Sequence, residues 1–600
     1  MNGRYRAALA AGGLAAGLIS MTSQAANLPD GYWRPEQVKP ILSKTVTVHL
    51  APDLSGLSPA ERAAVQDLLE AGRLLHRIYL EQTHRASLTA KARLEKLNDQ
   101  LDQPPATRDL LKLFWMFKGP IATTLDNERE PFLPVEPQPP GRNVYPWNIA
   151  RATLDQYLAA HPRQRDALLA PRTIVREVTA DNIAADQATL KQYPALATLH
   201  PDFVHRLSAL DADRGAYYAV PYSVAYADDI VRAYHLLWHA ADAIEASDPD
   251  FADYLRNRGR DLLSDNYESG DAAWVTGDFK TLDAQIGSFE TYDDKLYGVK
   301  TFFSLSLLLK DRQRSAAVKK ALKHLQAIEN NLPYEHHKQV ITDIPVGVYN
   351  VIADFGQARG TNTASILPND PRHAEKYGRT ILLRYNIMTN PALFADSEAA
   401  WKAAVVEADQ DDLTMDGGFQ RTLWHEIGHY LGVAQTVDGR NLNAALAPNG
   451  NLFEEMKADL VSLFAAPELH KAGYYNDAAL RAVYAAGVER TLQTVKPRRD
   501  QPYQTMELMQ MNYFLRHGLL SFDRDSGRLA IHYGKYHEVV TDMLRDVLAI
   551  QYAGNPDRAA AFIDEYATWD DDVQGVIAKH IRAATQYRYA LVKYAALQDQ

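Results

Sequence analysis

The spacing of apolar residues along this chain predicts a mostly helical protein. Apolar side chains recur every three or four residues in "PAERAAVQDLLEAGRLLHRIYLEQ" (59–82), in "RSAAVKKALKHLQAIENN" (314–331) and over most of the chain beyond residue 396. This period places the apolar side chains on one face of a helix, which can then pack against a core. We therefore expect helices to form most of the molecule.

Strand-like alternation of apolar and polar residues is confined to five short segments. They are "KTVTVHL" (44–50), "TIVREV" (173–178), "KLYGVKTF" (295–302), "QVITDIPVGVYNVI" (339–352) and "RTILLRYNIM" (379–388). Three of them fall between residues 270 and 390, which predicts a small β subdomain there. The proline-rich stretch 130–146 is typical of a surface loop or a connection between lobes.

The length of 600 residues is too great for one hydrophobic core, so we expect two or more lobes. Apolar residues make up 46% and charged residues 23%, as in an ordinary soluble globular protein. The net charge of −11 argues against nucleic acid or an anionic membrane as the main partner. No apolar run after the N-terminal segment is long enough to span a bilayer.

The N-terminal segment has the pattern of a signal peptide. Arginines at positions 4 and 6 precede a short apolar run, residues 7–21, and Ser23-Gln24-Ala25 then offers small residues around a cleavage site. We expect residues 1–25 to direct export and to be removed, which would make the mature protein periplasmic or secreted.

The chain contains no cysteine. Disulfides, cysteine-based zinc sites, iron–sulfur clusters and a thiol nucleophile are therefore excluded. Any metal ion must be held by histidine and carboxylate ligands.

A metal site is indicated by "WHEIGHYLG" (424–432), which has helical spacing. His425 and His429 stand four residues apart, on one helix face, so both imidazoles can reach one ion. Glu426 lies beside them, where it can take a proton from a metal-bound water whose pKa the ion lowers. His235 and His239 have the same spacing without the glutamate, and we interpret that pair as a packed or solvated helix face.

A catalytic zinc ion usually has three protein ligands, so a third one is needed. The metzincin pattern would place a histidine at position 435, but Gln435 stands there and its amide oxygen is a poor zinc ligand. The alternative is a carboxylate on the next predicted helix, "LFEEMKADLVSLFAA" (452–466). If that helix returns antiparallel, Glu455 can complete the site, and Glu454 and Asp459 can accept hydrogen bonds from the imidazole N–H groups. We expect one Zn²⁺ per chain.

H-E-x-x-H followed by E-E-x-K-A-D resembles the dipeptidyl peptidase III family of zinc metallopeptidases. The usual family signatures are H-E-x-x-G-H and E-E-x-R/K-A-E/D, and the shorter first motif resembles that of prokaryotic members. "IGSFETYDD" (286–294) is similar to the family segment that carries a substrate-binding glutamate and a tyrosine that stabilises the transition state. Those positions fall on Glu290 and Tyr292.

Two further segments extend the resemblance. "ILPND" (366–370) resembles the family's N-I-P-N loop and puts the asparagine that helps hold the substrate N-terminus on Asn369, although Ile366 replaces the first asparagine. "HGLLSFDRDSGRLAIHYGKYHEVV" (517–540) is similar to the segment with a histidine that stabilises the transition state. His537 is the nearest match and His532 is its rival.

The resemblance implies an α+β, mostly helical fold with two lobes around a cleft. The lower lobe, with a small β-barrel, would comprise residues 26–310 and 348–390, and the helical zinc-binding upper lobe would comprise residues 311–347 and 391–600.

The implied function is that of a zinc-dependent exopeptidase that releases dipeptides from the N-terminus of oligopeptides. Glu426 would act as the general base, Tyr292 and His537 would stabilise the oxyanion, and Glu290 and Asn369 would anchor the free α-amine. The alternatives are a gluzincin endopeptidase, another aminopeptidase, and a non-catalytic zinc-containing protein that binds peptides.

Overall fold

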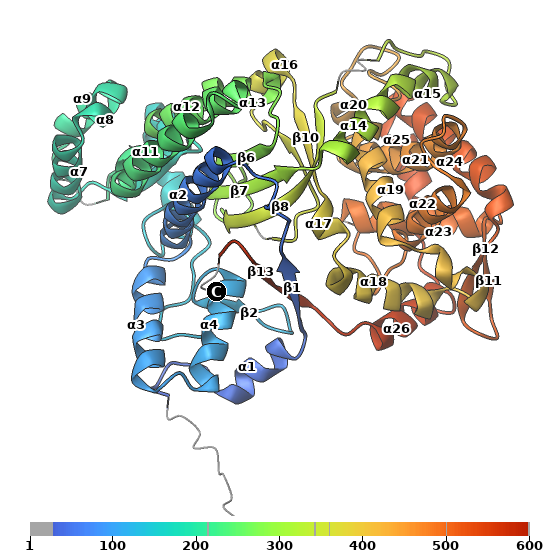
Figure 1. Ribbon diagram of the computed structural model, residues 1–600, viewed down its shortest axis with the longest axis horizontal. Coiled ribbons are helices and arrows are strands. Elements are labelled where there is room, and N and C mark those ends of the chain that lie inside the picture. The colour runs from blue at the N-terminus through green and yellow to red at the C-terminus, as the bar shows by residue number, and fades with distance from the viewer. Residues whose placement is uncertain (1–27, 213–214, 341–343, 359, 500, 598–600) are drawn as a thin grey trace, which may run out of the picture.

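Helices predominate in the structure, and one small mixed sheet lies near its middle (Figure 1). The computed structural model describes residues 28–212, 215–340, 344–358, 360–499 and 501–597. Residues 1–25, which the sequence predicts to be a signal peptide, lie outside the described residues, so export stays a prediction. In the described part of the chain, no helix combines the length and the apolar character that crossing a bilayer requires.

The central sheet has five strands in the order β6 (Leu282–Ser288), β7 (Phe303–Lys310), β8 (Val346–Gly356), β10 (Thr380–Arg384) and β9 (Ala364–Leu367). β10 runs parallel to β8, and the other neighbours are antiparallel. A barrel closes only if its edge strands pair. Among the described residues the ladder ends at β6 and at the four-residue β9, so the sheet is open rather than the small β-barrel that the resemblance implies.

The long helix α2 (Pro59–Thr83) packs on β7 and β8 and on helix α11 (Ala227–Ile244). The helix starts at a proline after the capping residue Ser58, whose hydroxyl accepts the Glu61 N–H. Gly72 allows the close approach to the sheet, because a Cβ there would lie 2.3 Å from the Phe355 ring. The predicted helix at 59–82 is confirmed.

The predicted strand at 295–302 is wrong, because these residues form turns before β7 begins. Strand residues need partners for their backbone N–H groups. Here the buried Asp294 carboxylate supplies those partners, so the segment bends around this side chain. It accepts hydrogen bonds of 2.9–3.0 Å from the backbone N–H groups of Leu296, Tyr297, Val299 and Lys300.

Helices make up the other half of the molecule, shown at the right of Figure 1. Their apolar faces form one hydrophobic cluster that extends from Val318 to Ile581. α21 lies at the centre of this cluster and packs against α19, α22, α23 and α24, which explains why it is apolar on nearly every side. The helices of this half are α14 (Arg312–Ala321), α15 (Leu325–Asn331), α18 (Pro391–Ala404), α19 (Met415–Gly428), α20 (Leu442–Ala445), α21 (Gly450–Lys471), α22 (Asp477–Glu489), α23 (Pro502–Arg516), α24 (Tyr536–Ala553), α25 (Pro556–Tyr566) and α26 (Gln574–Ala584).

The end of the chain returns to its beginning. β13 (Tyr589–Tyr594) pairs in parallel with β1 (Thr45–Leu50), and Val592 and Tyr594 belong to the hydrophobic cluster that contains α2 and the central sheet. The predicted division into two lobes stays a prediction, but these last residues pack with the first half and not with the helical half to which the sequence assigns them.

Most of the remaining elements contribute to the cluster around α2 and the central sheet, and α1, α3 and α4 form a third hydrophobic cluster. The helices are α1 (Pro35–Leu42), α3 (Ser87–Gln100), α4 (Pro105–Phe117), α5 (Arg151–Ala160), α6 (Arg165–Leu168), α7 (Ala180–Gln192), α8 (Pro194–Leu199), α9 (Pro201–Ser208), α10 (Tyr222–Ala225), α12 (Pro249–Ser264), α13 (Glu268–Thr276), α16 (Pro371–Tyr377) and α17 (Tyr385–Met388). The strands are β2 (Ile121–Thr123), β3 (Arg129–Pro131), β4 (Thr173–Glu177), β5 (Tyr217–Pro221), β11 (Leu520–Asp523) and β12 (Arg528–Ile531).

Candidate metal centre

The helix α19 carries His425, and His429 follows its last residue. Its N-terminus is capped by Thr414, whose hydroxyl accepts the Gly417 N–H at 3.0 Å. Leu423 and Ile427 are fully buried in the helical cluster, which fixes the rotation of the helix about its axis. The histidine face is thereby turned toward α21.

α19 ends at Gly428, earlier than the periodicity predicts, and His429 follows it in a helical conformation. The buried Lys457 ammonium on α21 donates hydrogen bonds of 3.0 Å to the carbonyl oxygens of Gly428 and Leu431. Gly432 then takes a left-handed conformation, with φ of 85°, which favours glycine. The helix stops because a side chain from the neighbouring helix donates hydrogen bonds to the carbonyl groups at its end.

The return helix α21 brings Glu455 to the two imidazoles. The Glu455 Oε2 atom lies 3.3 Å from His425 Nε2 and 3.8 Å from His429 Nε2. One candidate ligand atom from each of the three residues lies within 4.8 Å of the other two. The structure thus brings together the three residues that the sequence predicts as metal ligands.

The other ring nitrogens of both histidines face carboxylates. His425 Nδ1 lies 2.7 Å from Asp459 Oδ1, and His429 Nδ1 lies 2.9 Å from Glu454 Oε1. A carboxylate acceptor at Nδ1 fixes the proton there and leaves the Nε2 lone pair free to bind a metal ion. Glu454 and Asp459 therefore lie where the sequence analysis expects them.

Charges around the centre keep these carboxylates ionised. Burial would raise the pKa of Glu454, but Lys457 and His429 outweigh it and lower the pKa to about 2. Burial also opposes ionisation of Asp459, yet Arg421, at 2.5 Å, and His425 hold its pKa well below the usual range.

Asp459 and Glu455 in turn raise the pKa of His425. Burial would lower the pKa of His425, but Asp459 and then Glu455 raise it to about 9. Burial would raise the pKa of Glu455, but the two histidines outweigh burial and lower it. The charged carboxylates around the two histidines therefore favour positive charge at this place, which a divalent cation would supply.

The donor set fits zinc. Two neutral imidazole nitrogens and one carboxylate oxygen are common ligands of catalytic zinc, and three protein ligands leave a fourth position for water or substrate. Carboxylates that hold the outer nitrogens are the usual support for histidine ligands. The arrangement can hold a divalent cation and polarise a group bound to it.

Two more side chains border the trio of ligands. Tyr503, at the start of α23, is 49% exposed and donates a hydrogen bond to Glu455 Oε1 at 3.2 Å. Burial, then Glu455, and more weakly Glu426, raise the pKa of Tyr503 to about 12. Glu426 itself is partly buried and follows His425 directly, and its charge acts on this phenol.

A separate hollow of about 220 Å³ lies beside the central sheet. Glu290 and Tyr292, in the loop after β6, line it. Asn369 donates its amide N–H to Glu290 Oε1 at 3.0 Å, so the structure brings together the two residues predicted to bind the substrate amine. Tyr292 is 47% exposed at this hollow.

Comparisons with solved structures identify the fold. The structure of dipeptidyl peptidase III from Caldithrix abyssi aligns with 94% of this chain and 99% of its own, with a TM-score of 0.78 and 23% sequence identity. Dipeptidyl-peptidase III from Corallococcus sp. strain EGB aligns over 95% and 99% of the two chains, with a TM-score of 0.68 and 24% identity. The chain has the dipeptidyl peptidase III fold. The family resemblance seen in the motifs is confirmed at the level of the fold.

The sequence comparisons add less than the fold does. No family model matches the chain. Nudix hydrolase 3 from Arabidopsis thaliana is 24% identical over an alignment of 560 residues, which covers 88% of this chain and 70% of that protein. Its similarity extends over most of the part that has the dipeptidyl peptidase III fold.

The structure places His537 away from the metal ligands, and its role in stabilising the oxyanion stays a prediction. His537, at the start of α24, packs against Phe464, with ring centroids 5.3 Å apart. Phe464 stands nine residues beyond Glu455 on α21, roughly 13 Å farther along the helix axis. Burial lowers the pKa of His537, and Glu468, farther still from the ligands, opposes this shift. The dipeptidyl peptidase III fold therefore does not bring this histidine to the metal ligands here.

The rival His532 does not reach the ligands either. It is exposed in the link between β12 and α24, and its Nε2 lies 3.0 Å from the Ser521 hydroxyl of the β11–β12 hairpin. Neither histidine therefore belongs to the group of candidate metal ligands.

Sequence reasoning missed Tyr503 and the role of Lys457. Tyr503 follows Pro502 at a helix start and stands in no motif, so no signal in the sequence marks it. Lys457 belongs to the E-E-x-K-A-D motif, and its fixed place within a buried helix was a signal that it has a structural partner.

Proposed function

We propose that this chain is a zinc-dependent exopeptidase that releases dipeptides from the N-terminus of oligopeptides. The observation that carries the proposal is the convergence of His425, His429 and Glu455, with Glu426 beside them, on a dipeptidyl peptidase III fold. The names of both similar solved structures describe peptidases of this kind.

The reaction needs a nucleophilic water and a group that takes its proton. A bound zinc ion supplies a Lewis acid that lowers the pKa of water and polarises the scissile carbonyl. Glu426 accepts the proton of the attacking water and returns it to the leaving amine. Asp459 and Glu454 hold the two imidazoles in orientation through their Nδ1 atoms.

The substrate end is recognised at the hollow beside the sheet. The Glu290 carboxylate, oriented by Asn369, binds the free α-ammonium of the peptide. The Tyr292 phenol donates a hydrogen bond to the oxyanion that develops on the scissile carbonyl. Because the amine is fixed at one point, cleavage falls at a constant distance from it.

The first experiment measures zinc content and turnover of an unblocked oligopeptide together. Wild type should contain about one zinc ion per chain, and Glu426→Gln should keep the metal and lose roughly 10²- to 10⁴-fold in kcat. Glu398→Gln, an exposed pair partner of Lys402 on α18, serves as the matched control and should keep wild-type kcat. Equal turnover by wild type and Glu426→Gln would leave a non-catalytic, zinc-containing peptide-binding protein as the better account.

The second experiment identifies the products from the same peptide with a free and with an acetylated N-terminus. The proposal predicts dipeptides from the free peptide and a large loss of kcat/KM after acetylation. Equal cleavage of both peptides would indicate an endopeptidase, and release of single residues would indicate another type of aminopeptidase.

A further inference from the structure

A cavity of about 620 Å³ lies between two of the hydrophobic clusters and uses no residue of the candidate metal centre. Its lining residues Phe355 and Leu597 belong to the cluster around α2 and the central sheet. Leu80 belongs to the third cluster, against which the lining residues Leu88 and Leu111 pack. A mostly apolar cavity of this size is typical of a binding site for a small organic molecule.

Three helices each turn one face toward this cavity. α2 contributes residues 73, 76, 77 and 80, α3 contributes residues 88, 91 and 95, and α4 contributes residues 108, 111, 112 and 115. Spacings of three and four place these residues on one face of each helix. On every helix the face extends over about two turns, or roughly 10 Å along the axis. The lining therefore suits an elongated ligand.

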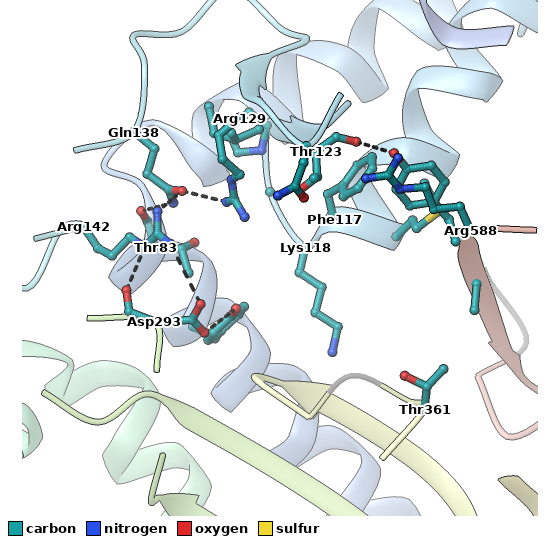
Figure 2. Close-up of a pocket in the computed structure, with 18 residues that line it drawn as sticks. Thr83, Phe117, Lys118, Thr123, Arg129, Gln138, Arg142, Asp293, Thr361 and Arg588 are labelled. Atoms are coloured by element: carbon teal, nitrogen blue, oxygen red, sulfur yellow. Dashed lines mark hydrogen bonds and ion pairs between the residues drawn. The ribbon is translucent and has the colours of Figure 1, made fainter. Parts of the chain in front are cut away.

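A second cavity, of about 380 Å³, lies on the other face of β13. Figure 2 shows its lining, where polar side chains such as Gln138 and Arg588 gather. Successive residues of a strand point to opposite faces, so Ala590 lines this polar cavity and Leu591 lines the apolar one. The two cavities have no lining residue in common among the described residues, and they can be tested separately.

Basic side chains also line the apolar cavity. They are Arg73, Arg77, Lys91, Arg108, Lys112 and Lys593, and Glu95 is the one acidic residue in the lining that the structure describes. Four of them, Arg73, Arg77, Lys91 and Lys112, pair with carboxylates at 3.2 Å or less. Arg108 and Lys593 form no ion pair within the described ranges, and Lys593 is half-buried whereas Arg108 is exposed. Lys593 is therefore the cation that a ligand inside the cavity can neutralise.

His76 adds a second hydrogen-bond donor near Lys593. The Trp115 ring lies 5.5 Å from the His76 ring, and the Trp115 Nε1–H donates to the carbonyl of Val592, next to Lys593, at 2.9 Å. His76 Nδ1 accepts the Gly356 N–H at 3.1 Å, so the neutral ring carries its proton on Nε2. No side chain or carbonyl of the described residues accepts a hydrogen bond from this Nε2–H.

An anion with a long apolar chain matches both parts of this lining. A carboxylate has two acceptor oxygens, one for the Lys593 ammonium and one for the His76 N–H. A half-buried ammonium without an opposite charge is costly, and the carboxylate offsets that cost. Each methylene group that leaves water for the apolar side chains of α3 and α4 adds to the affinity.

We infer that this cavity binds the anion of a long-chain fatty acid. Lys593 and His76 bind its carboxylate, and its acyl chain packs against Leu88, Leu111 and Phe355. The inference does not depend on the proposed peptidase activity.

Titration of the full chain with cis-parinarate, a fatty acid whose fluorescence rises in apolar surroundings, tests this site. Wild type should bind one molecule, and palmitate should displace it. Methyl palmitate keeps the chain but has no charge, so it should be at least about tenfold less effective than palmitate. Acetate keeps the carboxylate but has no chain, so it should not displace the probe. Equal displacement by palmitate and its methyl ester would overturn the inference, as would tighter binding of a lysophosphatidate with the same chain.

Variants separate the contribution of charge from that of space. Lys593→Met should weaken binding of cis-parinarate at least about tenfold, whereas Lys593→Arg keeps the positive charge and should stay within about threefold of wild type. Leu111→Trp fills part of the cavity without changing its charge and should also weaken binding at least about tenfold. Lys402→Met, which removes an exposed lysine of α18, is the matched control and should bind as wild type does. Wild-type affinity in Lys593→Met or in Leu111→Trp would contradict the inference, and equal melting temperatures establish that the variants are folded.

A zinc ion can itself bind a carboxylate, so one more variant separates the two places. Glu455→Gln alters the metal centre and should keep the full affinity for cis-parinarate. Palmitate should slow amide hydrogen exchange in residues 88–95 and 108–115 of wild type. Loss of binding in Glu455→Gln, or protection confined to α19 and α21, would refute the assignment.

Discussion

At the residue scale, the metal centre depends on one carboxylate from a distant part of the sequence. His425 and His429 stand at the end of α19, whereas Glu455 comes from α21 and approaches both imidazoles within 3.8 Å. Its position follows from α21 lying against α19, which the sequence could indicate only through the paired motifs.

Replacement of Glu455 should therefore remove the metal. We expect Glu455→Gln to weaken zinc binding at least a hundredfold, because an amide oxygen is a poor ligand and the negative charge is lost. Zinc retention against a chelator series measures the effect. Glu468→Gln, on the same helix but beside Lys471, is the control and should keep wild-type affinity.

Asp459 affects both the metal centre and the fold. It is buried and contacts Arg421, His425 and Gln510. Asp459→Asn leaves the buried Arg421 charge without its carboxylate, so the free energy of unfolding should fall by about 3–5 kcal/mol. Zinc affinity should fall about 10- to 100-fold, because a neutral amide oxygen is a weaker acceptor for the His425 N–H than the carboxylate.

Urea unfolding and chelator competition test both effects of Asp459→Asn. The exposed Asp477→Asn is the matched control, and its stability should stay within about 0.5 kcal/mol of wild type. Full zinc affinity in Asp459→Asn would show that the hydrogen bond to His425 has no part in metal binding.

At the element scale, periodicity predicts the helices better than it predicts their ends. The helices at 59–82 and 452–466 and the histidine-bearing helix appear in the structure because apolar stripes and capping residues are local signals. The end of α19 depends on Lys457, and the turns at 295–302 depend on Asp294. Both partners act through contacts that no local pattern in those segments reveals.

Lys457 links the end of α19 to α21, and its removal should loosen both. Lys457→Met deprives the carbonyls of Gly428 and Leu431 of their donor and leaves Glu454 without its cation. We expect a loss of about 3–5 kcal/mol in the free energy of unfolding and about tenfold weaker zinc binding. Chemical denaturation with and without zinc measures both.

Lys471→Met provides the comparison on the same helix, since Lys471 is 79% exposed. Its unfolding free energy should change by less than about 0.5 kcal/mol. An equally small change for Lys457→Met would mean that the end of α19 does not need the ammonium group.

At the scale of the whole molecule, the sequence predicts the residues of the candidate site better than it predicts how distant segments of the chain are arranged. The candidate ligands and their carboxylate partners can be predicted because they stand in short motifs whose residue types and spacing suit metal binding. The parallel β8–β10 and β1–β13 pairs join segments that are separated in sequence, and no periodicity encodes such a pairing. The place of His537 likewise depends on how α24 packs along α21, which no local pattern encodes.

The junction between α2 and the end of β8 makes stability depend on pH. His76 Nδ1 accepts the Gly356 N–H at 3.1 Å, which requires the neutral ring. Burial, then Lys118 and Lys91, lower the pKa of His76 from 6.5 to about 3. The unfolded chain therefore takes up a proton that the folded chain refuses between these values, and stability falls as the pH drops from about 6.5 toward 3.

His76→Gln should flatten this part of the pH dependence, because glutamine keeps an acceptor for Gly356 and does not titrate. Thermal melts of the two proteins between pH 7 and pH 4 measure the difference in slope. His239→Gln, at a 78% exposed position of α11, is the control and should follow the wild-type curve. Parallel curves for wild type and His76→Gln would exclude His76 as the source.

The parallel pairing of β1 with β13 has a consequence for biosynthesis. A ribosome releases residues 45–50 long before residues 589–594, so the nascent β1 exposes unpaired backbone groups until β13 has been made. The β1–β13 pair cannot form before β13 emerges, and a chaperone that shields the exposed strand would find its substrate in every copy that lacks β13.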